Sequence, residues 1–290
     1  MSESKTHTLN APGATLSYDI RAGEAGRSGP VLLMIGSPMD ASGFATLAGH
    51  FRDRTVVTYD PRGVGRSRRV DGAAWATPDE HAGDLRRLIA ELDTGPVDIF
   101  GSSGGAVNAL ALVAGHPEQV RTLVAHEPPI ATVLPDRAEA LAATEDINQT
   151  YERVGLGPAM AKFIAVTSVR GPIPADFPDH DQNPANFGLP AEDDGSRDNP
   201  MLGQHIVHVT HYEPNFDALR SAPTRIVVGA GAESEGAFTY RAALALAEQL
   251  GTEPVIFPSH HGGFLGGEFG QQGDPDAFAA TLRQALTESA

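Results

Sequence analysis

Hydrophobic positions in the first part of the chain form short apolar runs separated by segments with a helical period. Residues 15–20 alternate weakly, as an edge strand does, whereas residues 30–35 form a continuous apolar run. A continuous run of this length is typical of a strand buried on both faces. Residues 44–51 fit a short helix, and residues 55–59 fit the next strand.

A helix with a clear start signal follows at residue 77. Thr77 is a suitable N-cap, proline occupies the first turn, and two acidic residues lie at the positive end of the helix dipole. Residues 97–100 and 121–125 fit strands on either side of an apolar helix at 106–114. This repeated order predicts an α/β fold, with a mostly parallel central sheet flanked by helices on both faces.

The alternation stops after Pro129 and returns near residue 220. Residues 130–219 contain helix-compatible sequence and a polar tract rich in Pro, Asp, Asn and Gly. We interpret this segment as a helical cap inserted into a core made of residues 1–129 and 220–290. The core pattern resumes with strands at 225–228 and 254–257 and helices at 238–250 and 274–289.

Composition excludes several classes of protein. Twenty-one basic residues against thirty-seven acidic ones give a formal charge of −16, which repels nucleic-acid phosphates and anionic lipids. The chain has no cysteine, so disulfides and thiolate catalysis are excluded. It also has no apolar run of ~18–20 residues, and its first eight residues do not resemble a secretory signal. We expect a cytoplasmic protein without nucleic-acid or membrane partners.

The strongest chemical signal is the sequence GSSGG at residues 101–105, between the strand at 97–100 and the following helix. This is G-x-S-x-G in the strand–turn–helix context that a nucleophile elbow requires. The tight turn holds the hydroxyl of Ser103 clear of the sheet, and the glycines let strand and helix approach closely. The helix N-terminus offers free N–H groups to a developing oxyanion. Ser103 is therefore the candidate nucleophile.

With this motif the chain resembles the α/β-hydrolase family over nearly its whole length. Residues 60–67, DPRGVGRS, resemble the family's D-x-R-G-x-G-x-S loop, which we interpret as a structural turn. The sequence HGGF at 261–264 resembles the loop of the catalytic histidine, which makes His261 the candidate base and His260 the alternative. A serine at residue 103 differs from the branches that use Asp there to hydrolyse epoxides or haloalkanes.

The resemblance also implies an acid that precedes the histidine in the chain. Glu233 follows the strand at 225–228 at the spacing usual for this acid, although the family more often has Asp. Glu127, at the end of the preceding core strand, is the alternative acid and is expected near the pocket in either case. Glu235 is expected to face solvent. We favour Glu233.

Two backbone N–H groups are expected to form the oxyanion hole. One belongs to Gly104, the residue after the nucleophile. The other is assigned to Ser37 in the sequence IGSP at 35–38, which resembles the family's H-G-x-P loop; Pro38 has no N–H to offer. Ile35 stands where the family usually has histidine, so the loop lacks that hydrogen-bonding side chain.

The histidines at 205, 208 and 211 are spaced by three in the predicted cap. Two of them could share one face of a helix, but the third is rotated away and no carboxylate occurs at matching spacing. We therefore expect no metal site and no cofactor, and we expect one or two of these side chains to face the substrate cleft. Other histidines, among them His81, are expected at exposed or ordinary packing positions.

The resemblance and the apparent Ser–His–Glu set imply a serine hydrolase with a small-molecule substrate. An ester, a lactone or a related acyl compound would react through an acyl-serine intermediate on Ser103. Hydrolysis of carbon–carbon bonds or thioesters, and acyl transfer, use the same residue types and remain open. A non-catalytic small-molecule receptor on the same fold is the other alternative. The sequence leaves the oligomeric state open.

Overall fold

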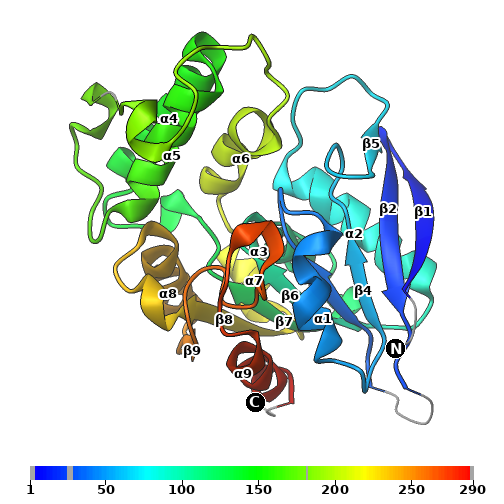
Figure 1. Cartoon of the computed structure of the whole chain (residues 1–290). Coiled ribbons are helices and arrows are strands. Elements are labelled where there is room, and N and C mark those ends of the chain that lie inside the picture. Colours follow the sequence, from blue (N-terminus) through cyan, green and yellow to red (C-terminus); the bar gives the residue numbers. More distant parts are fainter. Residues whose placement is uncertain (1–3, 25–28, 181, 288–290) are drawn as a thin grey trace.

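The computed structural model describes residues 4–24, 29–180 and 182–287. Within them, nine strands form one sheet in the order β1-β2-β4-β3-β6-β7-β8-β9, with β5 paired to β2 (Figure 1). The pairs β1–β2, β2–β4 and β2–β5 are antiparallel, and the strands from β4 through β3 to β9 are parallel. The predicted mostly parallel α/β sheet is confirmed. The strands are β1 (Lys5–Ala11), β2 (Ala14–Arg21), β3 (Leu32–Ile35), β4 (Val56–Tyr59), β5 (Arg68–Arg69), β6 (Val97–Ser102), β7 (Val120–His126), β8 (Arg225–Gly231) and β9 (Val255–Phe257).

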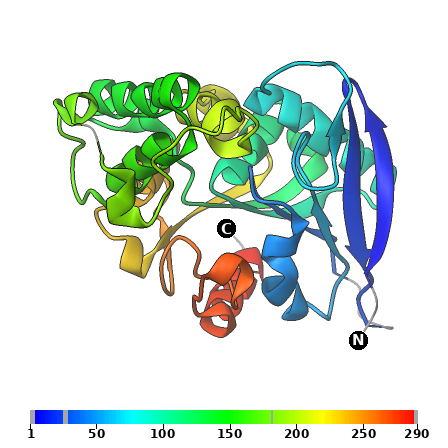
Figure 2. The ribbon, with the colours of Figure 1, turned by 45° about the horizontal axis from the view of Figure 1, so that its top comes forward.

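Helices cover both faces of this sheet, as Figure 2 shows with α1 and α9 on one side and α2 and α3 on the other. Helix α9 contacts α1 and the strands β7 and β9, whereas α3 contacts α2 and the strands β6 and β7. The helices that flank the sheet are α1 (Ala45–Gly49), α2 (Pro78–Leu92), α3 (Gly104–Gly115), α7 (Phe216–Ser221), α8 (Phe238–Leu250) and α9 (Pro275–Thr287).

The strand β3 shows why the sheet is buried on both faces. Leu33 and Ile35 pack in the cluster formed with α2, α3 and α8, while Leu32 and Met34 pack in the cluster formed with α1 and α9. All four side chains are fully buried. The continuous apolar run therefore supplies apolar contacts to both helical layers, which alternating polar residues could not do.

A further helical layer lies beyond one edge of the sheet, at the upper left of Figure 1. It comprises α4 (Arg137–Val154), α5 (Leu156–Ser168), a π-helical turn η6 (Pro200–His205) and α6 (Ile206–Thr210). Helix α4 contacts both α5 and α6. Helix α7 crosses residue 219 and contacts α3 and α8. The division into core and cap at 130–219 stays a prediction.

Some elements differ from those predicted. Strand β1 was not predicted, because most of its residues are exposed and no apolar alternation marks them. Strand β8 runs to Gly231, three residues beyond the predicted end at 228. Helix α9 ends at Thr287 within the described residues, and the predicted continuation over 288–289 lies outside them.

Helix α3 approaches β3 closely at Gly105, and this contact gives a test of the fold. A Cβ added at Gly105 would lie 2.4 Å from the carbonyl oxygen of Ile35, whereas one added at Gly115, at the other end of α3, would meet nothing within 4 Å. We expect Gly105→Ala to lower the free energy of unfolding by about 1–3 kcal/mol through overpacking. Gly115→Ala should leave it unchanged or raise it by up to ~1 kcal/mol. Urea unfolding of both variants checks this, and equal effects would contradict the close packing at Gly105.

Candidate active site

Ser103 occupies the sharp turn between β6 and α3. Its backbone has φ 56° and ψ −127°, a strained conformation for a residue with a Cβ. Its N–H donates to the carbonyl oxygen of His126, at 2.9 Å, which ties the turn to the neighbouring strand β7. The sharp strand–turn–helix arrangement predicted from GSSGG is therefore formed, with Ser103 at the carboxyl end of β6 and directly before the N-terminus of α3.

Glycines allow two other backbone segments to approach this turn. A Cβ on Gly101 would lie 2.9 Å from Cα of Ala106, and one on Gly104 would lie 2.5 Å from the carbonyl oxygen of Ser37. Real Cβ atoms do not reach such distances, so the close approach requires glycine at both positions. As a result, Gly104 and Ser37, the expected oxyanion donors, lie next to each other beside Ser103.

His261 contacts a buried carboxylate. Its Nδ1 lies 2.5 Å from Oε2 of Glu127. The Glu127 side chain is fully buried, whereas the His261 side chain is 43% exposed, so the carboxylate lies beneath the imidazole. Glu127 also accepts hydrogen bonds from the N–H of Gly231, at 2.8 Å, and from Oγ1 of Thr239, at 2.9 Å. Three donors thus hold this carboxylate in one orientation.

The protonation of this pair follows from its surroundings. Burial alone would raise the pKa of Glu127. The hydrogen bond and the charge of His261 act in the opposite direction, as do the charge of His126 and the hydrogen bond from Gly231, and the pKa falls to about 2. Glu127 is therefore ionised near neutral pH and can only accept hydrogen bonds. In the neutral form of His261, the proton must then be on Nδ1, which leaves the lone pair on Nε2. This is the tautomer that a general base requires.

The geometry favours Glu127, the alternative acid, over Glu233. Glu233, which the sequence favoured, lies in the short 3-10 turn Ala232–Ser234; it is exposed, and its N–H donates to the carbonyl oxygen of Ser259. Among the described residues, the carboxylate hydrogen-bonded to His261 is that of Glu127. The reason is local: Glu127 has φ 46°, so the chain turns sharply after β7 and directs this carboxylate back under the imidazole.

Ser103, His261, Gly104 and Ser37 all line one cavity of about 440 Å³. Glu233 and His260 reach the same cavity wall. The rest of the wall comes mainly from the helical layer and from α8, with apolar side chains such as Phe163, Val166, Met201, Ile206, Val209 and Phe238. The cavity therefore places an apolar binding space next to the predicted catalytic residues.

His260, the alternative base, makes other contacts. Its Nδ1 accepts from the N–H of Gly262, at 3.0 Å, and its Nε2 lies 3.1 Å from the carbonyl oxygen of Gln272. Both ring nitrogens are thus used within the loop itself. This arrangement favours His261 over His260 as the base.

The loop at residues 60–67 forms hydrogen bonds to neighbouring segments, which agrees with its interpretation as a structural turn. The carboxylate of Asp60 accepts from the backbone N–H groups of Ala41, at 3.0 Å, and Arg66, at 2.7 Å. Ser67 donates to the carbonyl oxygen of Asp60 and accepts from the N–H of Ser17. These contacts join the loop to β2 and to the turn after β3, and none involves Ser103 or His261.

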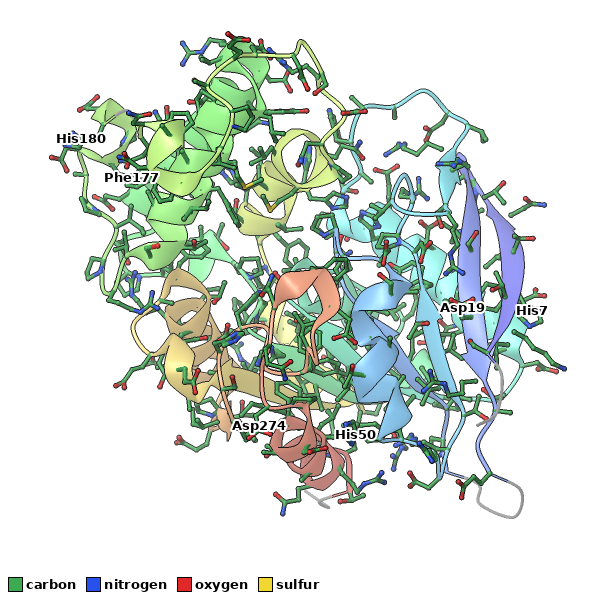
Figure 3. All side chains as sticks on the ribbon, viewed as in Figure 1. His7, Asp19, His50, Phe177, His180 and Asp274 are labelled. Atoms are coloured by element: carbon green, nitrogen blue, oxygen red, sulfur yellow. The ribbon has the colours of Figure 1, made fainter. Side chains whose placement is uncertain are left out.

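The histidines at 205, 208 and 211 point to three different partners. The Nδ1 of His205 lies 3.0 Å from Oγ of Ser37, the ring of His208 stacks on Trp75, and His211 lies near Thr144 and Glu145. Of the three, His205 lines the cavity. Figure 3 shows His7, His50 and His180 at separate places on the periphery. Within the described ranges, no group of three or more His, Cys, Asp or Glu side chains could hold a metal ion.

His126 is a buried group that the sequence did not single out. Its ring packs against Phe257 and Phe278 and lies 6.2 Å from the ring of His261, between centroids. Its ring nitrogens have no hydrogen-bond partner among the described residues. Burial lowers its pKa to about 4, against the opposite effect of the Glu127 carboxylate.

This buried imidazole should make the fold sensitive to acid. Below about pH 6.5 the unfolded chain binds a proton at His126, while the folded chain stays neutral there until about pH 4. The free energy of unfolding should therefore fall as the pH drops from 6.5 to 4.5, by up to roughly 3 kcal/mol for this one group. His126→Phe, whose ring cannot be protonated, should show a shallower decline in urea unfolding. The exposed His7→Gln serves as the control, and identical pH slopes in all three proteins would contradict this assignment.

The sheet order and the serine turn define a protein of the α/β-hydrolase class, and comparisons with known proteins agree. A family model described as alpha/beta hydrolase fold matches residues 29–185. The uncharacterised hydrolase YraK of Bacillus subtilis (strain 168) is 32% identical over 265 residues, which cover 89% of each chain. This chain therefore belongs to the alpha/beta hydrolase fold family.

Solved structures share this fold at low sequence identity. A thermophilic esterase from Thermogutta terrifontis is 20% identical, with a TM-score of 0.64 and 98% of each chain covered. The enol-lactonase from Burkholderia xenovorans LB400 is 19% identical, with a TM-score of 0.65, covering 97% of this chain and 100% of that one. None of the helices in the described part of the chain has the length and apolar character that crossing a membrane requires.

Proposed function

We propose that this protein is a serine hydrolase that cleaves a small-molecule ester or lactone, with Ser103 as nucleophile, His261 as general base and Glu127 as the acid. The observation that carries the proposal is the 2.5 Å contact between His261 and the buried Glu127, in a wall that also contains Ser103. A serine hydroxyl is a poor nucleophile without a base, and the base needs a group that fixes its tautomer. Ligand binding alone would require none of these features.

The proposed reaction proceeds in two steps. Oγ of Ser103 attacks the carbonyl carbon while Nε2 of His261 takes the hydroxyl proton, and Glu127 stabilises the imidazolium. The N–H groups of Gly104 and Ser37 stabilise the oxyanion. The carbon–oxygen bond to the leaving group then breaks, and the departing alkoxide receives the proton from His261. Water repeats the sequence on the acyl-serine and releases the carboxylic acid.

The lining of the cavity favours a substrate whose bound part is mainly apolar and uncharged. Its walls are rich in Phe, Val, Ile and Met side chains, and the full charges among the described residues around it belong to Arg170 and Glu233. A volume of about 440 Å³ accommodates a small organic molecule. The segment at 130–219 supplies much of this wall, so we propose that it acts as a cap. Solved structures of the same fold include an esterase and an enol-lactonase, and these names agree with the proposed class by analogy.

The direct test is a screen of p-nitrophenyl esters of increasing acyl length, with lactones and thioesters in parallel. We expect saturable turnover of uncharged esters or lactones and poor turnover of acyl groups that carry a carboxylate. Preferred turnover of thioesters would change the assigned bond type. Tight binding without turnover of any of these compounds would favour a small-molecule receptor.

A further inference from the structure

The loop after β3 takes a hydrogen-bonding partner from the helical layer. Oγ of Ser37 and Nδ1 of His205 lie 3.0 Å apart, and they join residues that are 168 positions apart in the chain. Both residues are buried, with exposed fractions of 4% and 2%. His205 is the last residue of η6, so this contact connects the helical layer directly to the loop that carries the expected oxyanion donor.

The imidazole of His205 is itself held in place. It stacks on the ring of His81 of α2, with ring centroids 5.2 Å apart and an angle of 28° between the planes. Burial lowers the pKa of His81 well below its ordinary value and that of His205 to about 4. Both rings are therefore neutral near pH 7, and they pack without charge repulsion. The stack leaves His205 little freedom to turn away from Ser37.

Ser37 lies where small shifts matter for catalysis. Its carbonyl oxygen and its Cβ would lie 2.5 Å and 3.3 Å from a Cβ at Gly104, so this loop is in contact with the N-terminus of α3. Ser37 and His205 line the same cavity as Ser103. Oxyanion stabilisation depends on donors held at hydrogen-bonding distance before the reaction starts. A loop that moved by a fraction of an ångström would lose part of that stabilisation.

We propose that His205 is a positioning residue for the oxyanion hole. Its hydrogen bond to the Ser37 hydroxyl fixes the loop after β3 so that the backbone N–H of Ser37 meets the tetrahedral intermediate. This inference rests on the proposed function. It also explains how the loop can have Ile35 where the related family usually has histidine. Ile35 offers no hydrogen bond, and His205 supplies one to the loop from the helical layer instead. The oxyanion hole is then complete only when η6 is docked on the loop.

The test is a double-mutant cycle on the full chain, assayed with the best p-nitrophenyl ester. Ser37→Ala keeps the backbone N–H and removes only the hydroxyl, and His205→Phe keeps a ring to stack on His81. We expect each change to lower kcat about tenfold while KM stays within about twofold, because the lost interaction is one made in the transition state. The kcat of the double variant should also lie about tenfold below that of the wild type, and no lower, because both changes remove the same hydrogen bond.

Two further variants separate positioning from folding. The side-chain amide of His205→Asn reaches the place of imidazole Nδ1, so this variant should recover most of the wild-type kcat. His208→Phe, three residues along the chain and stacked on Trp75, should match wild type. Thermal unfolding followed by circular dichroism reports whether each variant is folded.

The outcomes distinguish this inference from the proposed function. The positioning role would be overturned if the kcat losses of the two single variants multiplied in the double variant. It would also be overturned if the folded single variants kept the wild-type kcat. In both cases the hydrolase assignment would stand. Failure of His205→Asn to recover activity above His205→Phe would also overturn the positioning role. A folded wild type that hydrolyses no acyl substrate, and whose Ser103 does not react with a fluorophosphonate, would instead remove the proposed function.

Discussion

Replacing Ser103 by alanine should lower kcat/KM for the best ester by roughly 10⁵–10⁶-fold. Without Oγ there is no atom to form the acyl intermediate, and the base has no proton to take. The residual rate should come from the oxyanion donors and substrate binding alone. Steady-state hydrolysis of a p-nitrophenyl ester measures this loss. Pre-steady-state release of p-nitrophenol should show an initial burst in the wild type, if deacylation is the slower step, and no burst in the variant.

Ser102→Ala is the matched control for this change. Ser102 is the neighbouring residue, buried at the end of β6, and it has no role in the proposed mechanism. Its replacement should keep activity within about tenfold of wild type, an allowance for packing losses in the turn. Equal losses from both serine changes would show that the turn, rather than the Ser103 hydroxyl, had been damaged.

Glu127→Gln should lower kcat by roughly 10³–10⁴-fold with little change in KM. The amide keeps the size of the side chain but loses the charge that stabilises the imidazolium. It can also donate a hydrogen bond to Nδ1 of His261, which would favour the tautomer with the proton on the wrong nitrogen. The effect should therefore appear in the chemical step and be absent from substrate affinity.

Glu233→Gln is the comparison that decides between the two acids. Glu233 is exposed and reaches the same cavity, but its carboxylate is not the one bonded to His261. We expect this variant to keep kcat within about threefold of wild type, as for other exposed charges away from a specific contact. A severe loss in Glu233→Gln, with near-normal turnover in Glu127→Gln, would restore the acid favoured by the sequence.

Local signals in the sequence predicted much of the fold. The continuous apolar run of β3, the capped start of α2 and the GSSGG turn each depend on residues close together in the chain. Thr77 is the N-cap, as predicted, and the structure adds a capping box between Thr77 and Glu80. Strand β1 was not predicted because its side chains are mostly exposed and its apolar residues do not alternate regularly with polar ones. Sequence patterning identifies elements that bury a face, and β1 buries little.

The site was less predictable, because its contacts join distant parts of the chain. His261 and Glu127 are 134 positions apart, and both glutamates follow core strands whose carboxyl ends meet at one edge of the sheet. What separates the two glutamates is the positive φ of Glu127, a backbone feature without a signature at that residue. His205 could not be linked to Ser37 from spacing, since η6 follows a long polar tract.

The most direct measurement is the site of covalent labelling by a fluorophosphonate, read by intact mass and peptide mapping. We expect one label per chain on Ser103 in the wild type, none in Ser103→Ala, and much slower labelling in Glu127→Gln at the same site. Labelling of another residue, or a full label that persists in Ser103→Ala, would contradict the assignment of Ser103 as the nucleophile served by His261 and Glu127.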